Sequence, residues 1–325
     1  MKKLSIVLLL TLLTVSCSNQ TPKIQKWDNT KYEHFESSFG IDVFNEHSDE
    51  MEKEEEKRYK ENNTLFISDL SKPITVKFNN NGKNRDFVMG VYYDYEPIHF
   101  KVGKMEDYDQ KYLFSLKDGY EMELPLYLPI DLKKSDAHKL MITFSAGPEV
   151  HAKDFNQSIG WYGATTLHDV IFDSNRENFS NPNNYTKSEA ISEFNYDYAL
   201  NQDYDYSVAK TGIMPVTPTS IKVKPKENFH LIYNVSSPSR KKGTVLLLTT
   251  IGFNHVPING EPYLLVQVPE KGTVSGEIMM TAPEKPGLYE IISYSVSNPF
   301  KKYQGNNLSD FLIEAAPRFT LEVEK

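Results

Sequence analysis

The stretch "IISYSVS", from Ile291 to Ser297, indicates the fold class most directly. Ile292, Tyr294 and Val296 alternate with serines. Successive side chains of an extended strand point to opposite faces of a sheet, so the apolar residues share one face and the serines the other. This alternation predicts an antiparallel sheet with one buried face and one face in water.

Segments of the same kind fill two stretches of the chain. The second stretch begins near Pro218 and the first covers about 65–150, and short Gly- and Pro-containing turns separate the segments in both. Neither stretch contains a convincing helical period. We therefore expect an all-β protein with two antiparallel β-sandwiches, at 64–152 and 217–325.

The segment "EKPGLYEIISYSV" adds a more specific signal. Gly287 and Tyr289 resemble the G-x-Y element before the penultimate strand of immunoglobulin-like sandwiches, in which the tyrosine hydroxyl bonds back to the backbone. The resemblance implies an immunoglobulin-like second sandwich, related to fibronectin or cadherin domains, without a disulfide. The corresponding stretch of the first sandwich, "DAHKL", lacks both residues.

The two stretches also share an order of signals. "YDYEPIHF" corresponds to "GFNHVPIN", and "YLFSLKDGYEMELPLYLP" corresponds to "YLLVQVPEKGTVSGEIMMTAP". "SDAHKLMITFSAGP" likewise corresponds to "EKPGLYEIISYSVSNP". The spacing between these blocks differs, so the repeat is weak, and it favours two related modules.

The N-terminus predicts export from the cytoplasm. Lys2 and Lys3 precede a twelve-residue apolar run, Leu4 to Val15, that is shorter than the about 20 residues a transmembrane helix needs. "LLTVSC", ending at Cys17, resembles the lipobox of bacterial lipoproteins, although Thr14 stands where that family prefers leucine. The resemblance implies a signal peptide at 1–16 and attachment of lipid, palmitate included, to Cys17. It places the protein on the extracytoplasmic side of the cell membrane. An ordinary secretory signal is the alternative.

Composition narrows the choice of partners. Cys17 is the only cysteine, so the fold has no disulfide. Cleavage would leave 309 residues with 34 basic and 44 acidic side chains, a balance of −10. Nucleic acid is therefore an unsuitable partner, and membrane contact is expected through the lipid.

Residues 17–63 are expected to form a tether and a short charged helix. The stretch "HSDEMEKEEEKRYKENN" pairs opposite charges at i,i+4 spacing but has no apolar stripe. It predicts a solvated spacer helix rather than a protein-binding helix.

Residues 153–216 form the predicted connecting segment, which is rich in aromatic residues, Asn and Asp. A segment of this length without structure is unusual in a compact protein, so it either packs between the sandwiches or forms a binding surface. Aromatic platforms with amide and carboxylate neighbours suit glycans, while a buried domain interface is the commoner use. The candidate ligand-binding residues are Trp161, Tyr162, Tyr196, Tyr198, Tyr204 and Tyr206.

Catalytic patterns are weak. Within "SVAKTG", the S-x-x-K and K-T-G patterns of penicillin-binding enzymes would share the single Lys210, whereas those enzymes need two lysines around the serine. His168 and Asp169 are neighbours on a predicted strand and should point to opposite faces, which favours a structural histidine. The Asp- and Asn-rich 195–205 stretch lacks a calcium-loop pattern. We predict no catalytic residue, metal or cofactor.

The leading functional prediction is a non-enzymatic extracytoplasmic lipoprotein that acts as a binding or envelope-structural module. Its partners would be the membrane, through the lipid on Cys17, and another envelope protein or a glycan. The alternative is a cell-wall or glycan-acting hydrolase, or a carbohydrate-binding protein, that uses residues 153–216.

Overall fold

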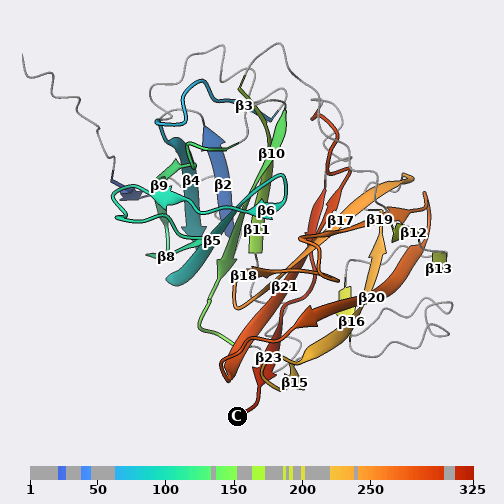
Figure 1. The fold of residues 1–325 in the computed structure, drawn as a ribbon. Helices are drawn as coiled ribbons and strands as arrows, with labels where there is room; N and C mark the ends of the chain where they lie inside the picture. Colours follow the sequence, from blue (N-terminus) through green and yellow to red (C-terminus); the bar gives the residue numbers. More distant parts are fainter. Residues whose placement is uncertain are drawn as a thin grey trace, which may run out of the picture.

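A computed structural model describes most of the two sandwiches. The described residues are 21–26, 38–44, 63–132, 137–151, 163–172, 186–187, 190–192, 199–201, 220–237, 241–303 and 312–325. Cys17, the expected charged helix and the six candidate aromatic residues lie outside these ranges. Every regular element within the ranges is a β-strand, which confirms the all-β class (Figure 1).

The first sandwich consists of an outer and an inner sheet. The strands of the outer sheet are β1 (Lys23–Lys26), β9 (Tyr120–Tyr127), β4 (Ile74–Asn81), β2 (Ser38–Phe44) and the short β7 (Lys101–Val102). The strands of the inner sheet are β3 (Thr64–Phe66), β11 (Gly163–Ile171), β10 (His138–Ala146) and β5 (Arg85–Tyr93), with β6 (Glu96–Pro97) and β8 (Lys111–Leu116) beside β5.

The second sandwich has the same plan. Its inner sheet orders β12 (Thr186–Lys187), β19 (Leu264–Val268), β17 (Gly243–Ile251), β21 (Gly287–Ser297), β23 (Phe319–Val323) and β15 (Ser220–Val223), with β18 (Asn254–Val256) on β17 and β22 (Ile313–Ala315) on β21. Its outer sheet orders β13 (Ala190–Ser192), β20 (Thr273–Thr281), β16 (Asn228–Ser236) and β14 (Ala199–Asn201).

Strand pairings establish how the two sandwiches correspond. In both, an edge strand of the inner sheet pairs in parallel with the last strand of that sheet in the sequence: β3 with β11, and β15 with β23. β10 and β21 pair antiparallel with β5 and β17, which are nine residues long and continue into short hairpins with β6 and β18. The order of strands therefore repeats as the sequence blocks predict.

The hairpin turns show which residues of the two sandwiches are equivalent. Asp94 and Tyr95 in the first sandwich, and Gly252 and Phe253 in the second, all have positive φ angles between 50° and 68°. Two consecutive positive φ values are the mark of a type I′ hairpin turn. A bulky residue in this conformation carries backbone strain.

A shared hydrogen bond then identifies equivalent residues on the neighbouring strands. The amide of Asp94 donates to the Lys139 carbonyl and the amide of Gly252 donates to the Glu290 carbonyl, each at 2.8 Å. Lys139 of β10 and Glu290 of β21 therefore occupy equivalent positions.

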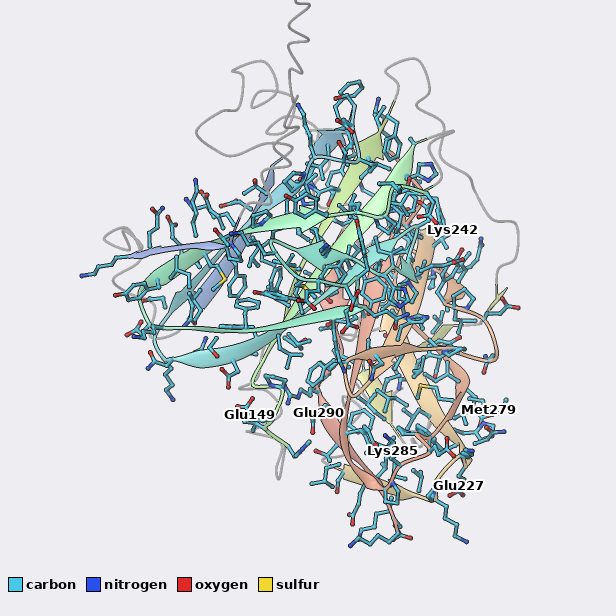
Figure 2. All side chains as sticks on the ribbon, turned by 60° about the vertical axis from the view of Figure 1, so that its left-hand side comes forward. Glu149, Glu227, Lys242, Met279, Lys285 and Glu290 are labelled. Carbon is cyan, nitrogen blue, oxygen red and sulfur yellow. The ribbon has the colours of Figure 1, made fainter. Side chains whose placement is uncertain are left out.

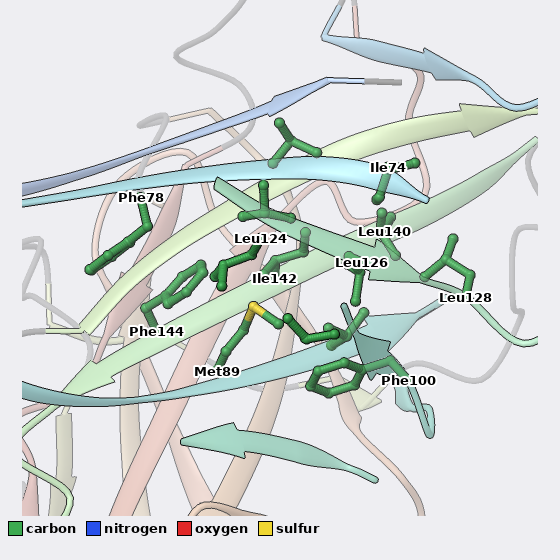
Figure 3. Packing of buried hydrophobic residues seen from close by; sticks show 14 of the residues in the cluster. Ile74, Phe78, Met89, Phe100, Leu124, Leu126, Leu128, Leu140, Ile142 and Phe144 are labelled. Atoms are coloured by element: carbon green, nitrogen blue, oxygen red, sulfur yellow. The ribbon is translucent and has the colours of Figure 1, made fainter. Parts of the chain in front are cut away.

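Apolar side chains fill each sandwich between its two sheets. In the first core, Phe78 stacks on Phe144 with ring centroids 4.5 Å apart and meets Phe87 edge-on at 4.7 Å (Figure 3). Burying a large apolar side chain stabilises a fold by about 1.5–3 kcal/mol. These cores hold the sandwiches together without disulfides.

A third apolar cluster joins the two inner sheets. It makes the molecule four layers deep, because the inner face of each sandwich packs on the other. Its buried members come from both sandwiches: Tyr92, Tyr95, Met141, Leu167, Leu246, Leu248, Leu265, Ile292, Tyr294, Val296 and Tyr303.

This junction corrects the expectation of a wet face at "IISYSVS". Ile292, Tyr294 and Val296 face the first sandwich, as members of the junction cluster. Ser293, Ser295 and Ser297 are at most 2% exposed, because they point into the second sandwich on the same face as Ile291. The alternation is confirmed, but both faces are buried, since a second sheet covers the face expected to meet water.

The predicted boundaries also change. β11 lies in the supposed connecting segment, yet it pairs along β10 as part of the first sandwich, so the predicted end at residue 152 is too early. β1 and β2 come from the predicted tether and pair with β9 and β4. β12, β13 and β14 extend the edges of the second sandwich. Strand pairing over long sequence separations decides these memberships.

No helix among the described residues is long and apolar enough to cross a membrane. The apolar run of the predicted signal peptide lies outside those residues.

Candidate functional site: an edge groove braced by the second sandwich

The tyrosine corner of the second sandwich is present. The Tyr289 hydroxyl donates to the Lys285 carbonyl at 2.7 Å. The Tyr289 ring also lies against Gly252, where an added Cβ would come within 2.9 Å of the ring. The G-x-Y prediction is thus confirmed.

His168 and Asp169 point in different directions, as expected of neighbours on a strand. His168 is fully buried, its Nε2 lies 2.7 Å from the Thr166 hydroxyl, and burial lowers its pKa to about 3. Asp169 faces the junction between the sandwiches. The prediction that the two side chains point to opposite faces is thus confirmed.

Asp169 belongs instead to a buried ionic cluster at the junction. Lys139 Nζ donates to Asp169 Oδ1 and to the Lys301 carbonyl, and Asp169 Oδ2 accepts from the Tyr303 amide at 2.7 Å. Both charged side chains are fully buried. Burial lowers the pKa of Lys139 and raises that of Asp169, and their mutual attraction opposes both shifts. The cluster ties the first sandwich to the 301–303 segment of the second.

In a second buried cluster, a charged side chain of the second sandwich reaches the backbone of the first. Arg318 Nε donates to Glu290 Oε2 at 2.8 Å, and Glu290 Oε1 accepts from the Thr320 hydroxyl at 2.7 Å. Arg318 also donates to the carbonyls of Ala146 and Gly147 at 2.8 Å each, and to that of Val150. One guanidinium thereby holds the 146–150 loop of the first sandwich, and Figure 2 shows Glu149 of this loop near Glu290 of β21.

The 146–150 loop forms one wall of a groove in the first sandwich. The larger part of the groove has a volume of about 640 Å³, within the range of about 300–1,000 Å³ typical of ligand sites. It is lined by residues of β1, β5, β8 and β9 and the adjoining turns: Ile24, Lys83, Asn84, Arg85, Asp86, Ser115, Leu116, Lys117, Tyr120, Gly147 and Glu149.

A second hollow of about 450 Å³ continues the groove along β8. It shares Asp86, Ser115 and Glu149 with the larger part and adds Leu113, Phe114 and Pro148. We call the combined feature the β8 groove. Two apolar side chains beside it are open to solvent: Ile24 is 57% exposed and Leu113 is 58% exposed.

Local hydrogen bonds fix the floor of the β8 groove. The Ser115 hydroxyl donates to Asp86 Oδ1, and the Asp86 carbonyl accepts from the Gly147 amide at 2.8 Å. The adjoining turns are held by Gly82 N to Asp118 Oδ1 at 2.6 Å and by Asp118 N to Asn84 Oδ1 at 3.0 Å. The groove is therefore preformed, and the second sandwich braces it through Arg318.

Sequence reasoning missed Lys139, Glu290, Arg318 and the groove. A signal did exist for the first three, because each places a charge inside or beside an otherwise apolar strand, as in "HKLMITF", "LYEIISY" and "PRFTLEV". The groove had no local signal, since its lining comes from five separate stretches of chain.

The predicted site residues Trp161, Tyr162, Tyr196, Tyr198, Tyr204 and Tyr206, and the Ser207–Lys210 pattern, lie outside the described residues. Within the part of the chain that the structure describes, no group of three or more His, Cys, Asp or Glu side chains is placed to hold a metal ion.

No protein-family model and no curated protein sequence matches the chain. Among solved structures, it is similar to the C-terminal domain of the Streptococcus agalactiae AgI/II polypeptide BspA, with 8% identity over 88% of this chain and 100% of that one and a TM-score of 0.23. The C-terminal domain of the Streptococcus pyogenes antigen I/II-family protein AspA gives 8% identity, coverage of 77% and 93%, and a TM-score of 0.23. A glycosyl hydrolase family 2 member from Bacteroides cellulosilyticus is 10% identical over 74% of this chain and 28% of that one, with a TM-score of 0.20.

The two immunoglobulin-like sandwiches are compatible with a binding or structural module.

Proposed function

We propose that the chain is a non-enzymatic lipoprotein that presents a binding module on the extracytoplasmic face of the cell membrane. The lipid on Cys17 anchors the module, and the β8 groove is its binding surface. The observation that carries the proposal is the construction of this groove: a preformed hollow with exposed apolar side chains, one wall of which is held by Arg318 of the other sandwich.

The use of the buried charges supports binding over catalysis. Lys139, Asp169, Glu290 and Arg318 are all engaged in contacts that join the two sandwiches. At the groove, the Ser115 hydroxyl is bonded to Asp86, and the described lining includes no histidine to act as its base. This arrangement suits recognition of a partner by shape.

Membrane attachment is tested by fractionation of cells that produce the full chain. We expect the wild-type protein in the membrane fraction and Cys17→Ala in the soluble extracytoplasmic or secreted fraction. A Cys17→Ala protein that remains with the membrane contradicts the lipid anchor.

The binding surface is tested with the mature chain carrying Cys17→Ser and with envelope preparations from the producing cells. We expect saturable binding that weakens by about tenfold or more when Ile24→Asp and Leu113→Asp are combined, because both charges fall beside the groove. Ile130→Asp is the matched control, since Ile130 is 72% exposed and does not line the groove. Equal binding by all three proteins contradicts the groove as the surface. Covalent labelling of Ser207 by a fluorescent β-lactam would instead support the enzymatic alternative.

A further inference from the structure

β8 has one edge that no described strand covers. It pairs only with β5 in the described part of the chain. The Asp86 carbonyl accepts from the Gly147 amide, so the backbone of Asp86 faces the β10 side of β5. Backbone groups alternate along an antiparallel strand, so Phe87 faces β8, where its partner is Phe114.

It follows that the backbone N–H and C=O groups of Leu113 and Ser115 point away from β5, toward the groove side. An uncovered edge of this kind is a template for pairing with another extended chain.

The second sandwich shows what such an edge accepts. β19 is the equivalent of β8, because Gly243 at the start of β17 pairs with Val268 as Arg85 at the start of β5 pairs with Leu116. The outer edge of β19 carries β12, a parallel strand opposite Val266 and Gln267. In this register, Gln267 corresponds to Ser115.

The outer sheets carry equivalent edge strands in both sandwiches. β9 and β20 carry the antiparallel strands β1 and β13, and β4 and β16 carry β2 and β14. Among the described strands, a counterpart of β12 is therefore what the first sandwich lacks. The β8 groove lies at this place, between Ile24 of β1 and Ser115 and Leu116 of β8.

We propose that the β8 edge accepts an extended segment of a partner protein, which runs parallel to β8 opposite Phe114 and Ser115 and fills the β8 groove. Backbone hydrogen bonds to Leu113 and Ser115 supply the pairing, and an apolar side chain of the partner packs on the exposed Ile24. Acidic residues in the segment are favoured, because Lys83, Arg85 and Lys117 outnumber Asp86 and Glu149 in the lining. This assignment deepens the proposed function and rests on it.

The occupant is assigned to a partner because the chain before β1 is unsuited. After the predicted cleavage only Cys17 to Pro22 precede β1, and the sequence "CSNQTP" offers no acidic side chain to match the basic lining.

The test selects random linear peptides from a display library on the mature chain carrying Cys17→Ser. Affinities of the synthetic peptides are then measured for three proteins: this chain and its Ser115→Pro and Ser115→Val variants. Proline removes the outward N–H of Ser115 without removing a backbone bond to β5. Both variants lose the hydroxyl that bonds to Asp86, but valine keeps the N–H. We expect peptide binding to weaken by about tenfold or more in Ser115→Pro and to change little in Ser115→Val.

Amide hydrogen exchange of the unsubstituted chain gives a second readout that does not depend on the folding of any variant. Peptide should slow exchange at Leu113 and Ser115 and leave the already paired Phe114 amide unchanged.

The proposal is overturned if the library yields no binder, if peptides bind Ser115→Pro and Ser115→Val equally, or if Leu113 and Ser115 gain no protection. Self-association of the chain that Ser115→Pro abolishes would also overturn it, by assigning the edge to a second copy. Loss of the lipid anchor or of envelope binding, with peptide binding intact, would contradict the proposed function alone.

Discussion

The two sandwiches place opposite charges at one equivalent position. Lys139 of β10 and Glu290 of β21 each accept the amide of the neighbouring hairpin turn, and each is buried at the junction. Lys139 reaches the 301–303 segment of the second sandwich, whereas Glu290 acts through Arg318 on the 146–150 loop of the first.

The two sandwiches use equivalent positions at the junction but place different residue types there. Each buried charge meets an opposite charge from the adjacent strand and backbone groups from the other sandwich, so neither is left alone in a medium where an unpaired ion is costly. The two clusters, one built on Lys139 and the other on Glu290, fix how the two similar surfaces pack on each other.

The same comparison extends to the hairpin turns. Tyr95 is fully buried and its hydroxyl donates to the Pro299 carbonyl at 2.5 Å, whereas its equivalent Phe253 lies under the Arg318 guanidinium at 5.4 Å. Both aromatic residues carry positive φ angles. Burial at the junction offsets the strain of these angles, which is of order 1–3 kcal/mol for a bulky residue.

The largest expected effect comes from breaking the first ionic cluster. Lys139→Ala leaves Asp169 as a lone buried carboxylate and should lower the free energy of unfolding by about 3–5 kcal/mol in urea titrations at neutral pH. The matched control is Lys139→Met combined with Asp169→Leu, which leaves no lone charge and should cost less. A double variant at least as destabilised as the single one contradicts the account.

Arg318→Met should cost slightly less, about 2–4 kcal/mol, because Glu290 keeps Thr320 and His151 as partners. In this variant, hydrogen exchange should accelerate more at the amides of the 146–150 loop than at those of β10. Arg318→Lys is the control: it retains the positive charge but cannot reach Glu290 and three carbonyls together, so it should restore only part of the stability. Full restoration by lysine would show that charge alone holds the loop.

His168 provides a pH-dependent contrast, because its equivalent in the second sandwich is Phe319. Its pKa in the folded protein is about 3, below the ordinary 6.5, so the unfolded chain binds the proton more readily. The stability is fully present above about pH 6.5 and declines as the pH falls toward 3. At pH 4 the expected loss is about 3 kcal/mol.

His168→Phe should make the unfolding free energy less sensitive to acid between pH 7 and pH 4. Some sensitivity should remain, since burial also lowers the pKa of His255, to about 4. An unchanged pH profile in His168→Phe would contradict the assignment.

The smallest expected effect is that of Tyr95→Phe, which gives the first turn the aromatic ring of the second. It removes the bond to the Pro299 carbonyl and should cost about 1 kcal/mol, measured by thermal or urea unfolding. Phe253→Tyr is the reciprocal control, and it should give no gain because Phe253 meets Arg318 through the face of its ring, a contact that an added hydroxyl does not change. A gain in that variant would show that the two turns are interchangeable.

Properties that depend on near neighbours along the chain could be predicted from the sequence. Period-two alternation predicted the strands, the G-x-Y element predicted the Tyr289 corner, and the shared order of blocks predicted two similar modules. It also predicted that His168 and Asp169 point apart. These features follow from the geometry of an extended chain and from contacts a few residues long.

What covers each face and edge of the sheets depends on contacts between distant parts of the chain. Alternation in "IISYSVS" separates two faces, but it carries no information that one meets the core and the other a second sandwich. The ladder of β10 with β11 and of β9 with β1 joins segments far apart in sequence. The burial of Lys139, the reach of Arg318 and the open edge of β8 all arise from such long-range packing, which a local pattern cannot encode.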